Sequence, residues 1–159
     1  MEIVLPKSRP FSFGGRLLAI QKKSGGLRPI AIGYTLRRLV SKRINSFAQS
    51  KLKDFFLPTQ LGVGVSGVCE AAVHSARRFI NYMTGDSVVA KLDFSNASNS
   101  IRRDKMLKAV TDSILELYPY CRAAYHGDSF WKLGCKSITS AEGVQQGDPL
   151  GPLLFCLTL

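Results

Sequence analysis

The sequence predicts a mixed α+β domain. Apolar residues recur at helical spacing in several longer stretches, and two stretches have the strand, glycine turn, strand pattern that is typical of β-hairpins. The 159 residues are 45% hydrophobic, which is enough to build one globular domain of ordinary size. We therefore expect helices and hairpins that share one domain.

The first part of the chain predicts a lead-in, a hairpin and a cationic helix. Residues up to about Gly15 contain two prolines and two glycines, which predicts a loosely structured lead-in. A hairpin follows, with arms at residues 17–22 and 28–32 and a Ser-Gly-Gly turn at residues 24–26. Thr35 is expected to cap the next helix. Its apolar residues at helical spacing are Leu36, Leu39, Val40, Ile44 and Phe47, and its cations, expected on the outer face, are Arg37, Arg38, Lys42, Arg43, Lys51 and Lys53.

A glycine-rich stretch, GVGVSG at residues 62–67, matches the pattern GxGxxG. A dinucleotide fingerprint requires a strand immediately before it and an acidic residue about 20 positions later. Here Pro58 interrupts the preceding residues, and Asp86 is the acidic candidate, with no βαβ pattern around it. The stretch therefore predicts a flexible lead-in to a helix, and nicotinamide binding is not expected.

Two helices and a strand are predicted in the middle of the chain. A helix over residues 69–83 carries an isolated histidine, His74, which we interpret as a surface or packing residue. A strand is expected at residues 88–92, and Asp104 favours the start of a second helix. The first helix should place in a core Ala72, Ala76, Phe79, Ile80 and Met83, and the second should place there Leu107, Val110, Ile114 and Leu117.

The last part of the chain predicts a second hairpin and an apolar helix. Residues 129–147 favour a hairpin that turns near Leu133 and Gly134. A helix is expected to begin near Pro149. Since the sequence ends inside this strongly apolar element, with nothing after it to pack on, we expect a domain that has been cut short.

The charge balance favours a polyanionic partner. The chain has 22 Lys and Arg against 11 Asp and Glu, a net charge of +11. Nucleic acid is the commonest partner of such a surface, although a merely solvated basic surface is the alternative.

The cysteines and the apolar stretches indicate the cellular compartment in which the chain is expected. Cys69, Cys121, Cys135 and Cys156 are far apart and form no zinc-type pattern, so we expect reduced, mostly buried thiols. The N-terminus lacks a signal sequence, and no apolar run approaches the roughly 20 residues of a membrane span. The sequence therefore predicts a soluble intracellular chain, with nucleus and cytoplasm both open.

Three groups of polar residues could carry chemistry. Lys22, Lys23 and Arg28 lie on the arms of the first hairpin, where cations can converge on a triphosphate. Asp93 follows a strand-like segment, and a carboxylate there is costly unless it is paired or binds a metal such as Mg²⁺. Residues 145–147, Gln-Gln-Gly, precede a helix start, where amides and backbone N–H groups could touch a nucleotide or a base pair.

Each group also has a plainer interpretation. Lysines beside a hairpin turn often only keep a sheet edge soluble. Asp93 could cap the following turn through neighbouring N–H groups. The Gln-Gln-Gly stretch could be an ordinary loop with Asp148 as the helix cap. From the residues alone, both interpretations of each group stay open.

Together and in order, these stretches resemble a known family. Four of them are similar to successive motifs of reverse transcriptases, especially those of non-long-terminal-repeat retrotransposons: KKSGGLRPIAIGYTLRRLVSKRI, QLGVGVSG, VVAKLDFSNASNSIRRDKML and EGVQQGDPLGPLLF. The resemblance implies a right-hand polymerase that is truncated before the family's Tyr-x-Asp-Asp hairpin. It places the fingers at about residues 1–85 and an incomplete palm at about residues 86–159.

The resemblance implies a metal-dependent reaction. Asp93 matches the first metal-binding aspartate of the palm, with the Phe94 carbonyl as a further Mg²⁺ ligand. The implied reaction is attack of a primer 3′-hydroxyl on the α-phosphate of a dNTP, on an RNA or DNA template-primer, with two Mg²⁺ ions. Ser98 stands where the family usually has a large aromatic residue that excludes the ribose 2′-hydroxyl, so sugar discrimination is in doubt.

The resemblance also implies a nucleotide site. The fingers cations that hold the incoming triphosphate match Lys22 or Lys23, together with Arg28. The pair that touches the incoming nucleotide and the template matches Gln146 and Gly147.

The sequence lacks the partner carboxylates that this site requires. The following aspartates do not lie in a matching context: Asp86, Asp104, Asp112, Asp128 and Asp148. We therefore expect that this chain does not polymerise DNA on its own. Two alternatives stay open beside an incomplete polymerase: a non-catalytic basic module that binds nucleic acid, and the functionless product of a decayed element.

Overall fold

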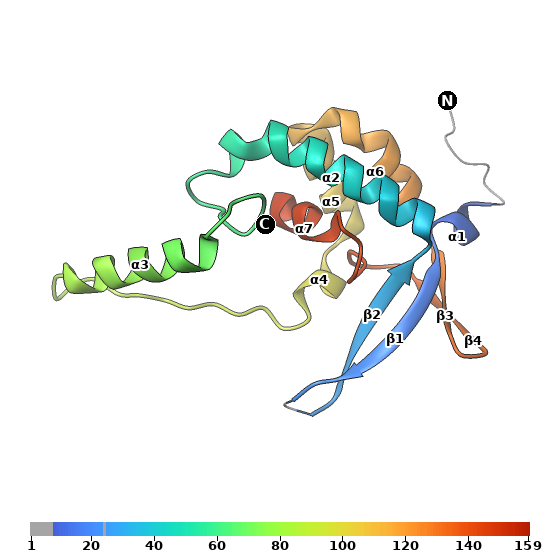
Figure 1. Ribbon diagram of the computed structural model, residues 1–159, viewed down its shortest axis with the longest axis horizontal. Coiled ribbons are helices and arrows are strands. Elements are labelled where there is room, and N and C mark those ends of the chain that lie inside the picture. The colour runs from blue at the N-terminus through green and yellow to red at the C-terminus, as the bar shows by residue number, and fades with distance from the viewer. Residues whose placement is uncertain (1–7, 24) are drawn as a thin grey trace.

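The computed structural model describes residues 8–23 and 25–159 (Figure 1). Its strands are β1 (Gly15–Gln21), β2 (Leu27–Gly33), β3 (Ser129–Leu133) and β4 (Lys136–Ser140). Its helices are α1 (Arg9–Ser12), α2 (Thr35–Phe56), α3 (Val68–Asn81), α4 (Ala97–Ser100), α5 (Arg103–Ser113), η1 (Leu115–Leu117, a 3₁₀ turn), α6 (Tyr118–Tyr125) and α7 (Gly151–Thr158). The predicted α+β class is confirmed.

Both predicted hairpins are present, and they join into one mixed sheet. The strand order is β2-β1-β3-β4, with antiparallel pairing inside each hairpin and parallel pairing between β1 and β3. In the first turn Gly25 and Gly26 have φ angles of 85° and 79°, which glycine adopts without strain. Ser24 of the predicted turn lies outside the described residues. Because the parallel pair joins strands from distant parts of the chain, the sheet brings the first hairpin close to the loop that follows β4.

A layer of helices holds the hydrophobic core. Figure 1 shows α2, α5, α6 and α7 gathered together, with the two hairpins extending away from them. The predicted stripe of α5 and η1 is buried as expected: Leu107, Val110, Ile114 and Leu117. Leu153 and Leu154 of α7 are fully buried, because this helix packs against α5. The apolar helix at the end of the sequence thus finds its packing partner earlier in the chain.

Helix α2 buries a different face from the predicted one. Leu36 and Leu39 of the predicted apolar stripe are 78% and 59% exposed. The buried residues are instead Arg37, Ser41, Ala48, Leu52 and Phe56. Arg37 can be buried because its Nη2 pairs with the Asp148 carboxylate at 2.7 Å, so it does not belong to the outer cationic face.

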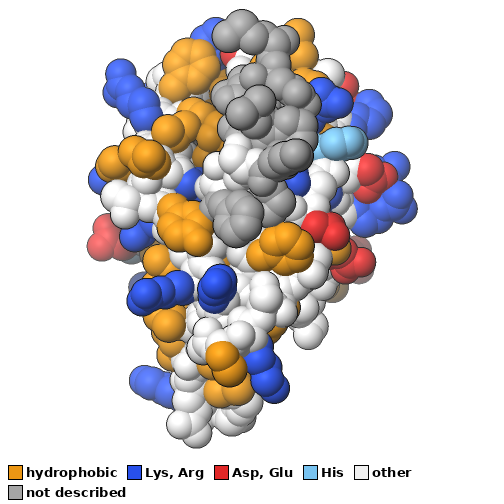
Figure 2. All heavy atoms as spheres, turned by 90° about the vertical axis from the view of Figure 1, so that its right-hand side faces the viewer, with side chains coloured by type: hydrophobic (Ala, Val, Ile, Leu, Met, Phe, Trp, Pro, Cys, Tyr) orange, Lys and Arg blue, Asp and Glu red, His pale blue; other side chains and the backbone are white. Residues whose placement is uncertain are grey.

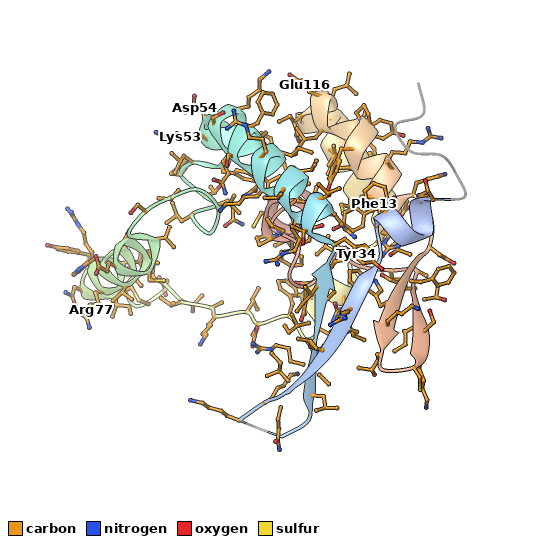
Figure 3. All side chains as sticks on the ribbon, turned by 45° about the vertical axis from the view of Figure 1, so that its right-hand side comes forward. Phe13, Tyr34, Lys53, Asp54, Arg77 and Glu116 are labelled. Atoms are coloured by element: carbon orange, nitrogen blue, oxygen red, sulfur yellow. The ribbon has the colours of Figure 1, made fainter. Side chains whose placement is uncertain are left out.

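The start of α2 also differs from the prediction. Tyr34, which Figure 3 labels at the beginning of the helix, occupies the cap position, and no side chain caps it. Thr35 is already the first residue of the helix, so the predicted threonine cap was wrong. Nearly two turns further along, Ser41 Oγ lies 2.7 Å from the hydroxyl of Tyr120 on α6. This hydrogen bond connects α2 to α6 through the long tyrosine side chain.

Helix α3 forms where predicted, but it has no buried face. No residue of α3 is buried, and all but Val68 at its start are exposed, including Phe79 at 52% and Ile80 at 54%. Of the predicted core residues in this region, Met83, just after the helix, is half-buried and the others are exposed. Figure 1 shows α3 standing away from the helical layer, and Figure 3 places Arg77 on this outlying helix. We call residues 68–94, which comprise α3 and the segment that follows it, the exposed arm.

The strand predicted at residues 88–92 is absent. These residues have irregular backbone, and Val88 and Leu92 are 84% and 80% exposed. A strand requires a neighbouring strand to satisfy its N–H and C=O groups. No strand in the described part of the chain pairs with this segment, so the prediction was wrong for a physical reason: the apolar pattern was present and the partner was not.

Residues 9–13 are more ordered than the predicted lead-in. They include the short helix α1, whose Arg9 guanidinium donates to the carbonyls of Ala123, Gly127 and Asp128 at 2.8–2.9 Å. Phe13 is buried in the core. These contacts anchor α1 to the end of α6, a helix that the sequence pattern did not predict. Residues 1–7 of the lead-in lie outside the described residues.

The cysteines are free thiols, as predicted, but they are not mostly buried. Cys121 is buried and Cys156 partly buried, whereas Cys69 and Cys135 are exposed. Cys69 lies on the exposed arm and Cys135 in the turn between β3 and β4, two places where little packs against the chain.

Candidate functional site

Three separate segments line one groove of about 460 Å³. The first hairpin contributes Lys22 and Arg28. The continuous segment from the end of the exposed arm through α4 contributes Phe94 and Ser98, and the loop before α7 contributes Gln146. The volume lies within the range of about 300–1,000 Å³ that is typical of ligand pockets. Most of the sequence-predicted site residues thus share one groove.

The Gln146 side of the groove is seated on strand β2. The backbone N–H of Ala31 donates to the carbonyl of Gln146 at 2.7 Å. Gly147 follows with a φ of 106°, and a Cβ at this position would lie 2.6 Å from the Ala31 oxygen. Since only glycine allows this approach, Gly147 explains why the loop can lie so close to the hairpin.

The opposite side of the groove is tied to the same loop. The backbone N–H of Val144 donates to the Ser98 carbonyl at 2.8 Å, and Gly143 donates to Ile101 at 3.1 Å. Within α4, the side chain of Asn99 donates to that of Asn96 at 2.7 Å. These bonds hold α4, and with it Ser98, beside the loop that carries Gln146.

The groove is cationic and rich in amides. Lys22 and Arg28 are both exposed side chains at its edge, while Asn96, Asn99 and Gln146 provide amide groups. No Asp or Glu is found among the described residues that line it. The chain as a whole has a surplus of cations, with 22 Lys and Arg against 11 Asp and Glu, and Figure 2 shows Lys and Arg side chains spread over one face with some Asp and Glu among them. This arrangement favours an anionic ligand with hydrogen-bonding edges.

Three predicted site residues lie outside the groove lining. Lys23 is exposed at the hairpin turn, next to Lys22. Gly147 lines an adjoining hollow of about 480 Å³ that shares Ser98 and Gln146 with the groove. Asp93 is exposed on the irregular end of the arm, and its neighbour Phe94 reaches the groove while Asp93 does not line it.

The residues present do not by themselves fit a two-metal centre. Within residues 8–23 and 25–159 no group of three or more His, Cys, Asp or Glu side chains is placed to hold a metal ion. Asp93 brings one carboxylate, whereas two Mg²⁺ ions that bridge reacting oxygens require more protein oxygen ligands than that. We therefore derive no step through a metal from this chain.

Sequence reasoning missed an ion pair that holds the loop. The Asp148 carboxylate, suspected only as a helix cap, accepts the Arg37 guanidinium at 2.7 Å and the backbone N–H of Leu150 at 3.0 Å. Both side chains are almost fully buried, with 2% and 4% of their surface exposed. The predicted helix cap at Asp148 was wrong: the cap position of α7 is Leu150, and no side chain caps it. The carboxylate closes a turn just before the helix, and the ion pair is additional. The sequence does offer one signal for this ion pair, which is an Asp just before a strongly apolar helix. A carboxylate in that place is buried with the helix and therefore needs a cationic partner.

A model of the reverse transcriptase (RNA-dependent DNA polymerase) family matches residues 20–159, nearly all of the chain. The chain belongs to the reverse transcriptase family. The resemblance noted from the four motifs is therefore confirmed, and the groove is a feature of a reverse transcriptase domain.

This reverse transcriptase chain is also similar to the retrotransposable element SLACS 132 kDa protein of Trypanosoma brucei gambiense. The two are 32% identical over 148 residues, which cover 89% of this chain and 12% of that relative. The chain thus spans about an eighth of the length of the curated relative that it matches. The similarity supports the retrotransposon type. Among the residues that the structure describes, no helix combines the length and apolar character needed to cross a bilayer.

Proposed function

We propose that this chain is the region of a retrotransposon reverse transcriptase that binds the incoming deoxynucleoside triphosphate. The observation that carries the proposal is the groove in which Lys22, Arg28, Ser98 and Gln146 meet. Its cations come from one hairpin and its amide and hydroxyl groups from two other segments, a combination that suits a ligand with phosphates at one end and a base and sugar at the other.

Each groove residue has a distinct part in this proposal. Arg28 binds phosphate oxygens through two parallel N–H groups, and Lys22 acts as a mobile point charge. Gln146, fixed through its own backbone, offers its amide to the base or sugar edge. Ser98 is small and leaves room beside the sugar, so we expect weak discrimination between ribose and deoxyribose.

The proposal extends to the arrangement of the whole domain. Residues 1–85 act as fingers that bring cations to the triphosphate, and residues 86–159 act as part of a palm. In the complete protein, the template-primer of RNA or DNA passes beside the groove, and the basic surplus of the chain favours its phosphates. RNA-directed DNA synthesis is then the reaction of the complete protein.

A nucleotide titration tests the proposal. A fluorescent dNTP is titrated with the unaltered chain, with Arg28→Gln, and with the control Lys105→Gln, which removes an exposed cation on α5. Because hydrogen bonds to charged groups are worth about 1.5–3 kcal/mol each, we expect Arg28→Gln to weaken binding by about tenfold or more. The control should leave the dissociation constant unchanged. Equal binding by all three chains would contradict the proposal.

Catalysis by the isolated 159-residue chain is not expected, because no acidic cluster that could hold a metal ion forms around Asp93 within the described residues. A primer-extension assay with an RNA template and Mg²⁺ checks this, and we expect no extended product. Extension that disappears in Asp93→Ala would contradict the expectation.

A second candidate function is binding of nucleic acid without catalysis. Two observations favour it: the net charge of +11, and the absence of a metal-holding acidic cluster from the part of the chain that the structure describes. In that case the chain would bind RNA or duplex with a steep salt dependence and no requirement for Mg²⁺ or dNTP. A filter-binding series over salt concentration, with and without dNTP, separates the two candidates.

A further inference from the structure

The loop that carries Gln146 is held by two buried arginines that come from different elements. Arg103 lies at the start of α5, and Arg37 lies in the first turns of α2. Neither residue lines the groove, and the sequence assigned neither a functional part. Their contacts nevertheless converge on residues 140–148, immediately before and after Gln146.

Arg103 binds the segment before Gln146 through nearly all of its N–H groups. Its Nε donates to the Gly143 carbonyl at 3.0 Å, and its Nη1 donates to the Ser140 carbonyl at 2.9 Å. Its Nη2 donates both to Ser140 Oγ at 2.8 Å and to the Glu142 carbonyl at 3.0 Å. A planar guanidinium thus fixes three backbone carbonyls within residues 140–143, which an apolar side chain could only pack against.

Burying the Arg103 guanidinium costs desolvation free energy, so we do not expect this residue to serve stability alone. Arg103 is 9% exposed, and no carboxylate in the described part of the chain forms an ion pair with it. Burial lowers the pKa of Arg103, because removing the guanidinium from water disfavours its charged form. An apolar residue of similar volume would often be at least as stabilising as a buried charge. The arginine is better explained by the backbone shape that its hydrogen bonds define.

Arg37 binds the segment after Gln146. Its Nη2 pairs with Asp148, and its Nη1 donates a short hydrogen bond to the Phe13 carbonyl. The same Phe13 carbonyl lies within 3.4 Å of the Gln145 amide nitrogen, so Arg37 and Gln145 share one acceptor. The loop is therefore anchored on both sides of Gln146.

One aromatic ring connects the two arginines. The guanidinium carbons of Arg37 and Arg103 lie 5.8 Å and 5.4 Å from the centre of the Tyr125 ring. Tyr125 is 1% exposed, and its hydroxyl lies 3.4 Å from the Asp148 carboxylate. A desolvated cation within about 6 Å of an aromatic ring is attracted to it, so Tyr125 couples the two anchors. We call Arg37, Arg103 and Tyr125 the arginine clamp.

We propose that the arginine clamp positions Gln146 for the nucleotide. The clamp residues touch no nucleotide; they act by pressing residues 145–147 onto β2, where the Ala31 amide meets the Gln146 carbonyl at 2.7 Å. This inference rests on the proposed function of the groove. It adds that helix α2, through Arg37, and helix α5, through Arg103, both set the groove's shape.

Amide exchange and nucleotide binding test the clamp together. The variant Arg103→Lys keeps the charge and loses the planar set of N–H donors. The control Arg102→Lys makes the same chemical change at the neighbouring residue, which lies on the surface. We expect Arg103→Lys to speed hydrogen exchange of the Ala31 amide at least tenfold and to weaken dNTP binding at least tenfold. The control should change neither. Exchange and affinity within twofold of the unaltered chain in Arg103→Lys would overturn the proposal.

A second variant separates positioning from stability. The double change Arg37→Met with Asp148→Leu replaces a buried ion pair by apolar side chains, a change that is often neutral or stabilising. We expect the melting temperature to be retained or raised, while dNTP binding weakens at least tenfold. If the clamp is purely structural, the double variant should keep both the melting temperature and the dNTP affinity.

The proposed function fails if the unaltered chain binds no dNTP. The exchange rate of the Ala31 amide in Arg103→Lys then tests the clamp alone: faster exchange supports it, and an unchanged rate overturns it.

Discussion

Helices α5 and α3 have similar apolar patterns and opposite surroundings. Both were predicted as amphipathic helices, and both form within a residue or two of the predicted start. In α5 the stripe of Met106, Leu107 and Val110 is buried under α7. In α3 the corresponding apolar residues, such as Phe79 and Ile80, are exposed to solvent. An apolar stripe thus predicts that a helix forms, whereas the presence of a partner decides whether the stripe contributes to stability.

The same contrast appears in the charged residues. In the helical layer, Arg37 and Asp148 are buried and bound to each other, so each depends on its partner. On the exposed arm, Glu70 and Arg77 are exposed to water and can be removed without leaving an unpaired charge. The comparison therefore predicts large effects in the layer and small effects on the arm for chemically equal changes.

The largest expected difference concerns thiol reactivity. Burial raises the pKa of the Cys121 thiol to about 12, and the side chain is inaccessible, whereas Cys69 on the arm is exposed. Because the thiolate is the reactive form, we expect maleimide at pH 8 to label Cys69 about a thousandfold faster than Cys121. Labelling followed by peptide mass spectrometry measures both rates. Comparable rates would show that the helical layer opens as readily as the arm.

The raised pKa of Cys121 also gives a pH dependence. The folded state keeps the proton that the unfolded state releases at its ordinary pKa of about 8.5. This contribution to stability is complete below about pH 8.5 and is lost as the pH rises toward about 12. Cys121→Ala should flatten the alkaline limb of a melting-temperature profile, while Cys69→Ala should leave the profile unchanged.

The next largest difference concerns a buried carboxylate. Asp148→Ala leaves Arg37 buried without its partner, so we expect the free energy of unfolding to fall by about 3–5 kcal/mol. Glu70→Ala removes an exposed carboxylate on α3 and should change the free energy of unfolding by less than about 0.5 kcal/mol. Urea titrations of the two variants make the comparison. A small loss in Asp148→Ala would mean that Arg37 finds water or another acceptor.

A smaller difference is expected for apolar truncation. Leu154→Ala opens a cavity in a fully buried site and should lower the free energy of unfolding by about 2–5 kcal/mol. Ile80→Ala removes side-chain atoms that are 54% exposed and should lower it by no more than about 0.5 kcal/mol. The same urea titrations apply. A loss above about 1 kcal/mol in Ile80→Ala would show that the arm is packed in solution, for example against a second molecule.

Much of the fold followed from local patterns in the sequence. The two hairpins follow from their Ser-Gly-Gly and Leu-Gly turns. Helix α5 follows from apolar residues at helical spacing within its own segment of the sequence. The buried face of α2 could not be predicted, because it depends on Asp148, which lies 111 residues away. The strand at residues 88–92 failed for a related reason, since no pairing strand exists among the described residues.

The residues that line the candidate site could be predicted from the sequence, whereas the arginine clamp that holds its loop could not. Lys22, Arg28 and Gln146 were recognised from charge, turn and motif order, and the structure brings them to one groove. The clamp was not predictable, because Arg103 sits in a segment whose charges all suggest a solvated helix start. Its function depends on backbone carbonyls, which leave no sequence signal.

The most direct test of the account is photo-crosslinking of a dNTP that carries a photoreactive base. After irradiation, peptide mass spectrometry locates the modified residues. The account predicts that labels concentrate at the residues that line the groove, which are 22, 27–30, 94, 96–99 and 146, and that excess unlabelled dNTP removes them. Labels spread over the exposed cations of α2 and α3, or labels that unlabelled dNTP does not displace, would contradict it.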